Sequence, residues 1–126
     1  MLADAMVVTT VAVTDLDRAK GFFGDQVGLR ILEETPFAIR FGAGPGSQVS
    51  VRRGQPNVGQ TVAHFEVEDI DSVFRDLLSR GVTFNEYESP KTTDFIAQVG
   101  LARAAWFSDP DGNVLGLRQG PIPGAG

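Results

Sequence analysis

Hydrophobic and polar positions follow the same order twice along this chain. The stretch VAVTDLDRAKGFFGDQVGLRI at 11–31 passes from alternating apolar residues through Asp-Leu-Asp into a helical pattern, a glycine and another apolar run. The stretch FEVEDIDSVFRDLLSRGVTF at 65–84 repeats that order. Alternation with a period of two is typical of a strand with one buried face, and the wider spacing is typical of an amphipathic helix. Each stretch therefore predicts a strand, a helix and a second strand.

Matching residues mark the ends of the two predicted helices. Asp15 and Asp69 stand at N-cap positions, where a carboxylate accepts the free amide hydrogens of the first turn and opposes the helix dipole. Gly28 and Gly81 stand where a glycine in the left-handed conformation commonly ends a helix. The chain therefore contains an internal repeat.

Further strands are predicted after each helix, at 29–35, 37–42 and 48–53, and then at 83–88, 102–108 and 113–119. Turns are marked by Pro36, by GAGPG at 42–46 and by DPDG at 109–112. Each half thus reads βαβββ, and neither half could bury both its sheet and its helix alone. We predict one α+β domain over residues 1–126, divided into a module at about 7–53, a linker at 54–60, a module at about 61–119 and a flexible tail at 120–126.

Composition narrows the classes of partner. The chain has a formal charge of −5, which argues against nucleic acid because such binding depends on clustered Lys and Arg. The overall field favours a cationic small molecule. No apolar run is long enough to span a membrane, the first residues do not resemble a signal peptide, and no cysteine is present. We therefore expect a cytoplasmic protein with no nucleic-acid or membrane partner.

Three segments carry a resemblance to a known family: VTDLDRAKGFF at 13–23, HFEVEDIDSVFRDLLSRGV at 64–82 and WFSDPDGNVLGL at 106–117. With the paired βαβββ modules, they resemble the glyoxalase/bleomycin resistance protein/dioxygenase superfamily, which has the vicinal oxygen chelate fold. The resemblance implies a cupped, half-open mixed β barrel with helices outside and a ligand cavity inside. It also implies a homodimer, in some members with modules exchanged between chains.

Enzymes of that family hold a divalent metal with His or Glu side chains on inward strand positions, where the cation binds neighbouring substrate oxygens. The positions in this chain that match those ligands are Val8, Ser50, Val62 and Gly116. Two valines, a serine and a glycine cannot hold a metal. We therefore expect no metal and no other cofactor.

Strand alternation predicts the cavity lining instead. In the order of the chain, the side chains expected to contact a ligand are Thr10, Ser50, His64, Glu66, Arg103, Trp106, Phe107 and Arg118. A tight hairpin at 108–113 would place Phe107 opposite Val114, and Arg103 opposite Arg118, on the cavity face. A glycine bulge would place Trp106 there instead, so these two aromatic residues are alternatives.

Two main functions remain compatible with this lining. The first is a metal-free protein that sequesters a small aromatic or cationic molecule, such as an antibiotic, in the cavity. The second is an enzyme, either with atypical metal ligands drawn from His64, Glu66 and Glu33 or Glu34, or with His64 or Glu66 as a metal-free base. His64 and Glu66 also have a structural interpretation, as a satisfied polar group and a salt-bridge partner. A third interpretation is an interaction module without a small-molecule ligand.

Overall fold

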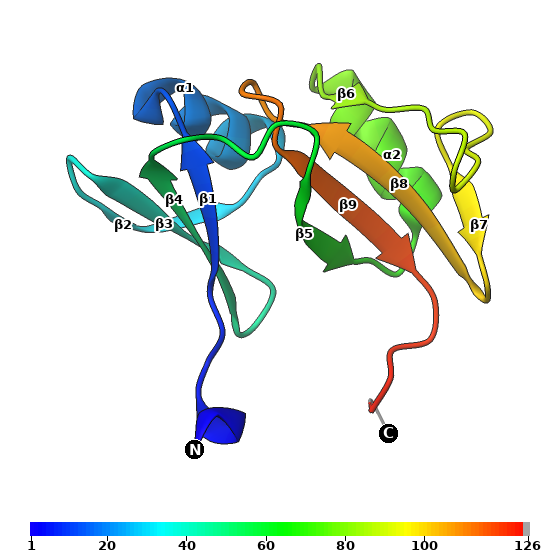
Figure 1. Cartoon of the computed structure of the whole chain (residues 1–126), viewed down its shortest axis with the longest axis horizontal. Helices are drawn as coiled ribbons and strands as arrows, with labels where there is room; N and C mark the ends of the chain where they lie inside the picture. The colour runs from blue at the N-terminus through cyan, green and yellow to red at the C-terminus, as the bar shows by residue number, and fades with distance from the viewer. Residues whose placement is uncertain (125–126) are drawn as a thin grey trace.

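The computed structural model describes residues 1–124 and contains two separate sheets with both α-helices on one side of them (Figure 1). The first sheet has the strand order β1-β4-β3-β2, and the second has the order β5-β9-β8-β6 with β7 added on β8. The elements are η1 (Leu2–Asp4), β1 (Thr9–Val13), α1 (Leu16–Lys20), η2 (Gly21–Gln26), β2 (Arg30–Glu34), β3 (Ala38–Ala43), β4 (Ser47–Arg53), β5 (Thr61–Glu66), α2 (Ile70–Ser79), β6 (Thr83–Phe84), β7 (Ala97–Val99), β8 (Ala102–Ser108) and β9 (Val114–Gln119).

The predicted α+β architecture is confirmed. The two sheets do not close into a barrel but form a cup, with the helices on its outside and both chain ends extending on the other side (Figure 1). Residues 125–126 of the predicted flexible tail lie outside the described residues. None of the helices within 1–124 has the length and apolar character needed to cross a membrane.

Both predicted helix starts are confirmed by side-chain caps. The Asp15 carboxylate accepts hydrogen bonds from the amides of Asp17 and Arg18 at 3.0 and 3.1 Å, and Asp69 accepts one from Ser72 at 3.2 Å. After each helical segment, Gly28 and Gly81 adopt positive φ angles of 86° and 84°. The first helix continues as the π-helical segment η2, which carries the buried rings of Phe22 and Phe23.

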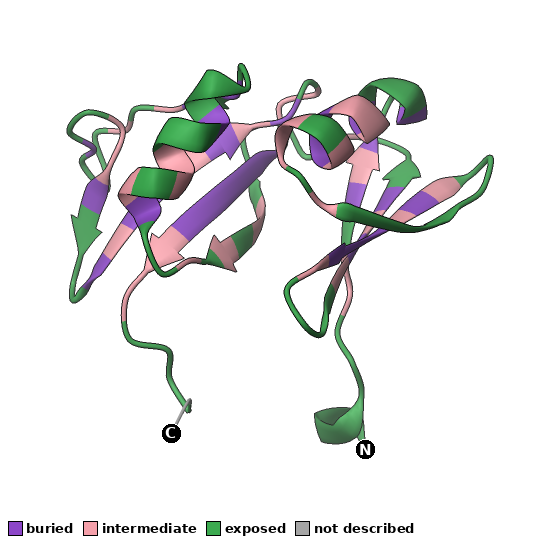
Figure 2. Ribbon diagram, turned by 180° about the vertical axis from the view of Figure 1, so that it is seen from behind, coloured by how far each residue is buried: buried purple, intermediate pink, exposed green. Residues whose placement is uncertain are grey.

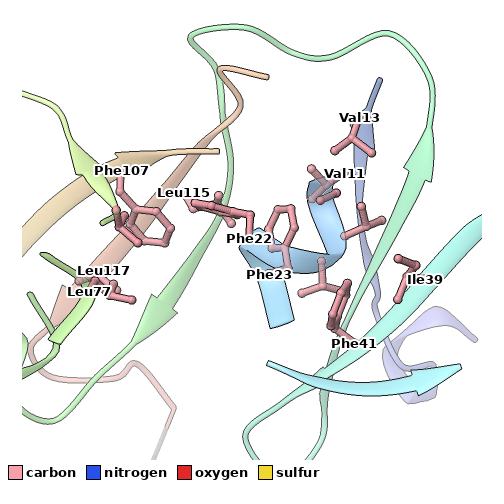
Figure 3. Close-up of a cluster of buried hydrophobic side chains, with 14 of the residues drawn as sticks. Val11, Val13, Phe22, Phe23, Ile39, Phe41, Leu77, Phe107, Leu115 and Leu117 are labelled. Atoms are coloured by element: carbon pink, nitrogen blue, oxygen red, sulfur yellow. The ribbon is translucent and has the colours of Figure 1, made fainter. Parts of the chain in front are cut away.

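A shared apolar core joins the two modules. On β1, Val11 and Val13 point into it, and on β9 the inward side chains are Leu115 and Leu117. Phe22 lies where the two modules meet (Figure 3). The centroid of its ring is 5.0 Å from that of Phe23 in the same module and 6.3 Å from that of Phe107 in the other module. Figure 2 shows that the purple buried positions lie on the strands beneath the helices, while the outer helix faces are exposed.

The turn between β8 and β9 adds a polar connection between the modules. Asn113 is fully buried, and its amide nitrogen donates to the carbonyl oxygen of Ala12 in β1 and to Asp109, both at 2.8 Å. Burial raises the pKa of Asp109, although hydrogen bonds from Asn113 oppose the effect. In the same turn, Asp111 accepts bonds from the backbone and hydroxyl of Thr14 at 3.0 and 2.7 Å. DPDGN therefore fixes the second module against the first within one chain.

The strand predicted at 83–88 is wrong beyond its start. Only Thr83–Phe84 forms a strand on β8, and one further backbone bond joins the Asn85 amide to the Trp106 carbonyl oxygen at 2.8 Å. The Glu86 carboxylate accepts bonds from the Thr92 hydroxyl at 2.6 Å and the Phe95 amide at 2.8 Å, and so holds the following loop. That loop supplies the short strand β7, which pairs with the first half of β8.

Candidate functional site

A cleft of about 540 Å³ lies on the concave face of the second sheet. We call it the concave cleft, and it is lined by Thr61, His64, Val99, Leu101, Ala102, Ala104, Trp106, Gly116, Leu117, Arg118 and Pro121. Most of these side chains are apolar, and the polar groups come from only four residues. A mainly apolar cleft with few polar groups is the usual form of a small-molecule site.

The floor of the cleft is a row of residues across three strands. His64 on β5 pairs with Gly116 on β9, and Gly116 pairs in turn with Trp106 on β8. A Cβ at position 116 would lie 3.1 Å from the His64 Cβ and 3.4 Å from the Trp106 Cδ1, closer than most real contacts. Glycine at this position therefore leaves room for the side chains of His64 and Trp106 on either side of β9.

Trp106 is held from one side by a second aromatic ring. Tyr87 packs edge-to-face against the indole, with 5.4 Å between the ring centroids and an angle of 89° between the planes. The indole is half-buried and lines the cleft. Such packing fixes the orientation of a flat ring without covering it completely.

Three polar side chains, His64, Glu66 and Arg118, are linked in a row along the edge of the cleft. His64 Nε2 lies 3.0 Å from Glu66 Oε1, and the Arg118 guanidinium donates to Glu66 Oε2 at 2.8 Å. Burial raises the pKa of Glu66, but the hydrogen bonds from His64 and Arg118 outweigh it, so the pKa lies below its ordinary value. A second guanidinium nitrogen of Arg118 donates to the Pro121 carbonyl oxygen at 2.9 Å. Glu66 thus orients both neighbouring side chains.

Three expected ligand residues, His64, Trp106 and Arg118, line the concave cleft, and Glu66 lies beside it. Sequence reasoning missed Thr61, Val99, Leu101 and Pro121. Ala102 and Ala104 also line the cleft, on the same face of β8 as Trp106. Because side chains alternate between the two faces of a strand, both could have been found once Trp106 was placed in the cleft.

Of the two aromatic alternatives, Trp106 lines the cleft and Phe107 does not, and the expected placement of Arg103 on the cavity face is wrong. Asp109 pairs with Asn113 through a 2.9 Å backbone bond, so Ser108, and not Phe107, lies opposite Val114. A shift of one residue moves every side chain of a strand to the other face. Phe107 is consequently 0% exposed in the core.

Arg103 lies on the helix side of the sheet for the same reason. It forms a bidentate ion pair with Asp71 of α2, at 2.8 and 2.9 Å. Hydrogen bonding from Arg103 lowers the pKa of Asp71, against the opposing effect of burial. Arg103 is therefore a connection between helix and sheet.

The first module does not contribute to the concave cleft. Thr10 and Ser50 pair across β1 and β4 on the face opposite the core residues Val49 and Val51, but neither lines the cleft. Val62 also departs from the predicted inward position. A bulge between Thr61 and Ala63 places Val62 against the core and brings Thr61 into the cleft.

The residues present do not fit the divalent metal that the family's enzymes hold. Val8, Ser50, Val62 and Gly116 offer no carboxylate, imidazole or thiolate. Within residues 1–124, no three His, Cys, Asp or Glu side chains come together in a way that could hold a metal ion. The alternative ligand Glu34 is on the other module, where it pairs with Lys20 at 3.0 Å.

Solved structures of similar sequence share this fold. A glyoxalase/bleomycin resistance protein from Streptomyces sp. CB03234 is 28% identical, with a TM-score of 0.70 over 91% of this chain and 100% of that one. TnmS3, an antibiotic binding protein from the same organism, is 27% identical, with a TM-score of 0.75 over 96% and 99%. A superfamily member from Sphaerobacter thermophilus DSM 20745 is 25% identical, with a TM-score of 0.74 over 94% and 99%.

No curated protein is similar enough to this chain to count as a match. The sequence model of one family matches residues 5–117, which is nearly the whole chain. The paired modules, the cupped sheets and the solved relatives agree with that match. The chain belongs to the Glyoxalase/Bleomycin resistance protein/Dioxygenase superfamily.

Proposed function

We propose that this protein binds a small aromatic molecule in the concave cleft, without a metal, and so removes it from solution without transforming it. The observation that carries this proposal is Gly116. At the position where related enzymes place a metal ligand, this chain has a glycine, and the indole of Trp106 lies against it. The site thereby offers an aromatic surface to a flat ligand where related enzymes hold a metal ion.

The surroundings of Trp106 support binding of an apolar ring. Val99, Leu101, Ala102 and Ala104 supply apolar surface, and Tyr87 fixes the indole. Stacking on a fixed aromatic ring stabilises a bound ring by about 1 kcal/mol beyond burial of apolar area. The similarity to TnmS3, an antibiotic binding protein, supports an antibiotic as the class of ligand.

Binding can be tested with N-phenyl-1-naphthylamine, a neutral aromatic probe whose emission rises in an apolar site. Trp106 is the only tryptophan, so energy transfer from protein to probe reports binding, and replacement of Trp106 tests whether the probe lies in this cleft. We expect Trp106→Ala to weaken binding of the probe about tenfold or more. Because this variant has no tryptophan, its binding is measured by direct excitation of the probe. Phe37→Ala, which removes a 77% exposed aromatic ring outside the cleft, is the matched control.

Equal binding by the wild type and Trp106→Ala would contradict the proposal. So would a loss of binding after dialysis against EDTA that added zinc or manganese restores, because the proposed site uses no metal.

A metal-free enzyme is the second candidate, favoured by the contact between His64 and Glu66. A carboxylate that orients an imidazole at the edge of a cleft is a suitable arrangement for proton transfer. Wild-type protein incubated in D₂O with carbonyl compounds would then exchange carbon-bound hydrogen, and His64→Gln would lose that exchange. The binding proposal predicts no exchange in either protein.

We also propose a homodimer in the cytoplasm. Apolar side chains on and next to β2 support association, since Ile31, Leu32 and Phe37 are 45%, 50% and 77% exposed. Light scattering after size exclusion should give twice the chain mass, and Phe37→Glu should lower it. Fractionation of the source cells would test the location.

A further inference from the structure

We propose that the ligand of the concave cleft is an aromatic anion, whose acidic oxygens bind at the Arg118 and His64 edge while its ring lies on Trp106. The inference rests on the proposed function and names the chemical class of its ligand. It differs from the expectation of a cationic ligand, which came from the net charge of the chain.

The polar groups of the lining carry the argument. They are the Thr61 hydroxyl, the His64 imidazole, the Trp106 indole N–H and the Arg118 guanidinium. The last two are donors only, and the lining residues within the described chain include no Asp or Glu. Such a set complements acceptor oxygens and offers no carboxylate to an ammonium group.

Arg118 is held in place before any ligand arrives. Its guanidinium donates to Glu66 at 2.8 Å and to the Pro121 carbonyl oxygen at 2.9 Å. The side chain still retains 28% of its exposure, and it lines the cleft. A planar guanidinium with its orientation fixed suits a carboxylate or sulfonate, because little conformational entropy is lost on binding.

Glu66 limits the strength of this attraction. Its carboxylate compensates part of the Arg118 charge, and it does not itself line the cleft. Removing the Glu66 charge should therefore strengthen anion binding. Removing Arg118 should weaken it more than the loss of one contact would, since Glu66 would then repel the ligand.

The net charge of −5 does not contradict an anionic ligand. Repulsion by distant carboxylates is screened over about 10 Å at an ionic strength of about 0.1 M. Contacts with Arg118 are made at a few ångströms and are screened far less. At such salt concentrations the lining of the cleft, more than the net charge, decides which ligand binds.

A matched pair of probes tests the inference. 8-Anilinonaphthalene-1-sulfonate and N-phenyl-1-naphthylamine have the same ring system and differ by one sulfonate. With energy transfer from Trp106 as the readout, we expect the wild type to bind the sulfonate at least about tenfold more tightly. Arg118→Gln should abolish that preference, and Glu66→Gln should increase it.

Arg103→Gln is the control, because it removes an arginine–carboxylate pair from the opposite face of the same sheet. It should leave the preference unchanged. Equal affinity for both probes, or an equal loss in Arg103→Gln, would overturn the inference and leave the proposed function standing. Failure of both probes to bind at Trp106 would overturn the proposed function as well.

Discussion

Replacement of Asn113 by alanine should destabilise the protein strongly, although the residue lies in the turn between two strands. Asn113 is fully buried, and its side chain makes hydrogen bonds of 2.8 Å to Ala12, Asp109 and Asn57. Two of these partners belong to other parts of the chain, the strand β1 and the linker between the modules. The truncation therefore removes a polar connection between the two modules.

The size of the effect follows from what each partner loses. The bond to Asp109 is buried and involves a carboxylate, so its loss costs about 2 kcal/mol. The bonds to the Ala12 carbonyl and the Asn57 amide are partly buried, and each costs about 1 kcal/mol. We expect the free energy of unfolding to fall by about 4 kcal/mol, which for a domain of this size moves the urea midpoint by about 2 M.

Urea denaturation followed by the emission of Trp106 measures this change. Asn57→Ala is the matched control, because Asn57 is exposed and only its backbone amide takes part in the connection. The control should lose less than about 0.5 kcal/mol. A loss below about 1 kcal/mol in Asn113→Ala, or an equal loss in the control, would refute the idea that this turn holds the modules together.

Three further predictions concern the core, the module junction and the cleft. Phe107→Ala should lower the free energy of unfolding, measured by urea denaturation, by about 4 kcal/mol, because the ring is 0% exposed. An equal loss in Trp106→Ala would contradict the observed register, which leaves that side chain half-buried. Burial raises the pKa of Asp111, but hydrogen bonds from Thr14 and the charge of Arg18 outweigh burial, so the pKa in the folded protein lies below the ordinary value of 3.8. The ionised Asp111 therefore stabilises the fold above pH 3.8, and this stabilisation is lost as the pH falls through the folded pKa. The difference in unfolding free energy between the wild type and Asp111→Asn should therefore shrink below pH 3.8, and a growing difference would reverse the argument. Gly116→Val should displace the indole, shift its emission and weaken binding of N-phenyl-1-naphthylamine about tenfold; unchanged emission and affinity would show that the close approach at Gly116 does not matter.

Patterns that depend on one element alone were readable in the sequence. The capping residues Asp15 and Asp69 follow from local spacing, and both are confirmed. The family was indicated by the resemblance of three segments to it, and it is also confirmed. The shared face of Gly116 and Arg118 on β9 also follows, because alternation within a strand is independent of its neighbours.

Features that depend on how elements meet were not readable. Whether Trp106 or Phe107 faces the cleft is decided by a single backbone pairing, Asp109 with Asn113, inside the turn. The bulge at Val62 leaves no hydrophobic pattern, and the three residues of β7 are too few to show an alternation that distinguishes a strand from a loop. Pro121 lies beyond β9, and its carbonyl oxygen accepts a bond from Arg118 that no alternation within a strand predicts.

The indole N–H resonance of Trp106 gives the most direct test of a metal-free ligand site in the concave cleft. Because the chain has one tryptophan, an ¹⁵N–¹H spectrum contains a single indole signal. Titration with N-phenyl-1-naphthylamine in the presence of EDTA should move that signal until it saturates, with the same Kd that the probe's emission reports. A signal that stays in place while the probe binds, or that moves only after zinc is added, would contradict the account.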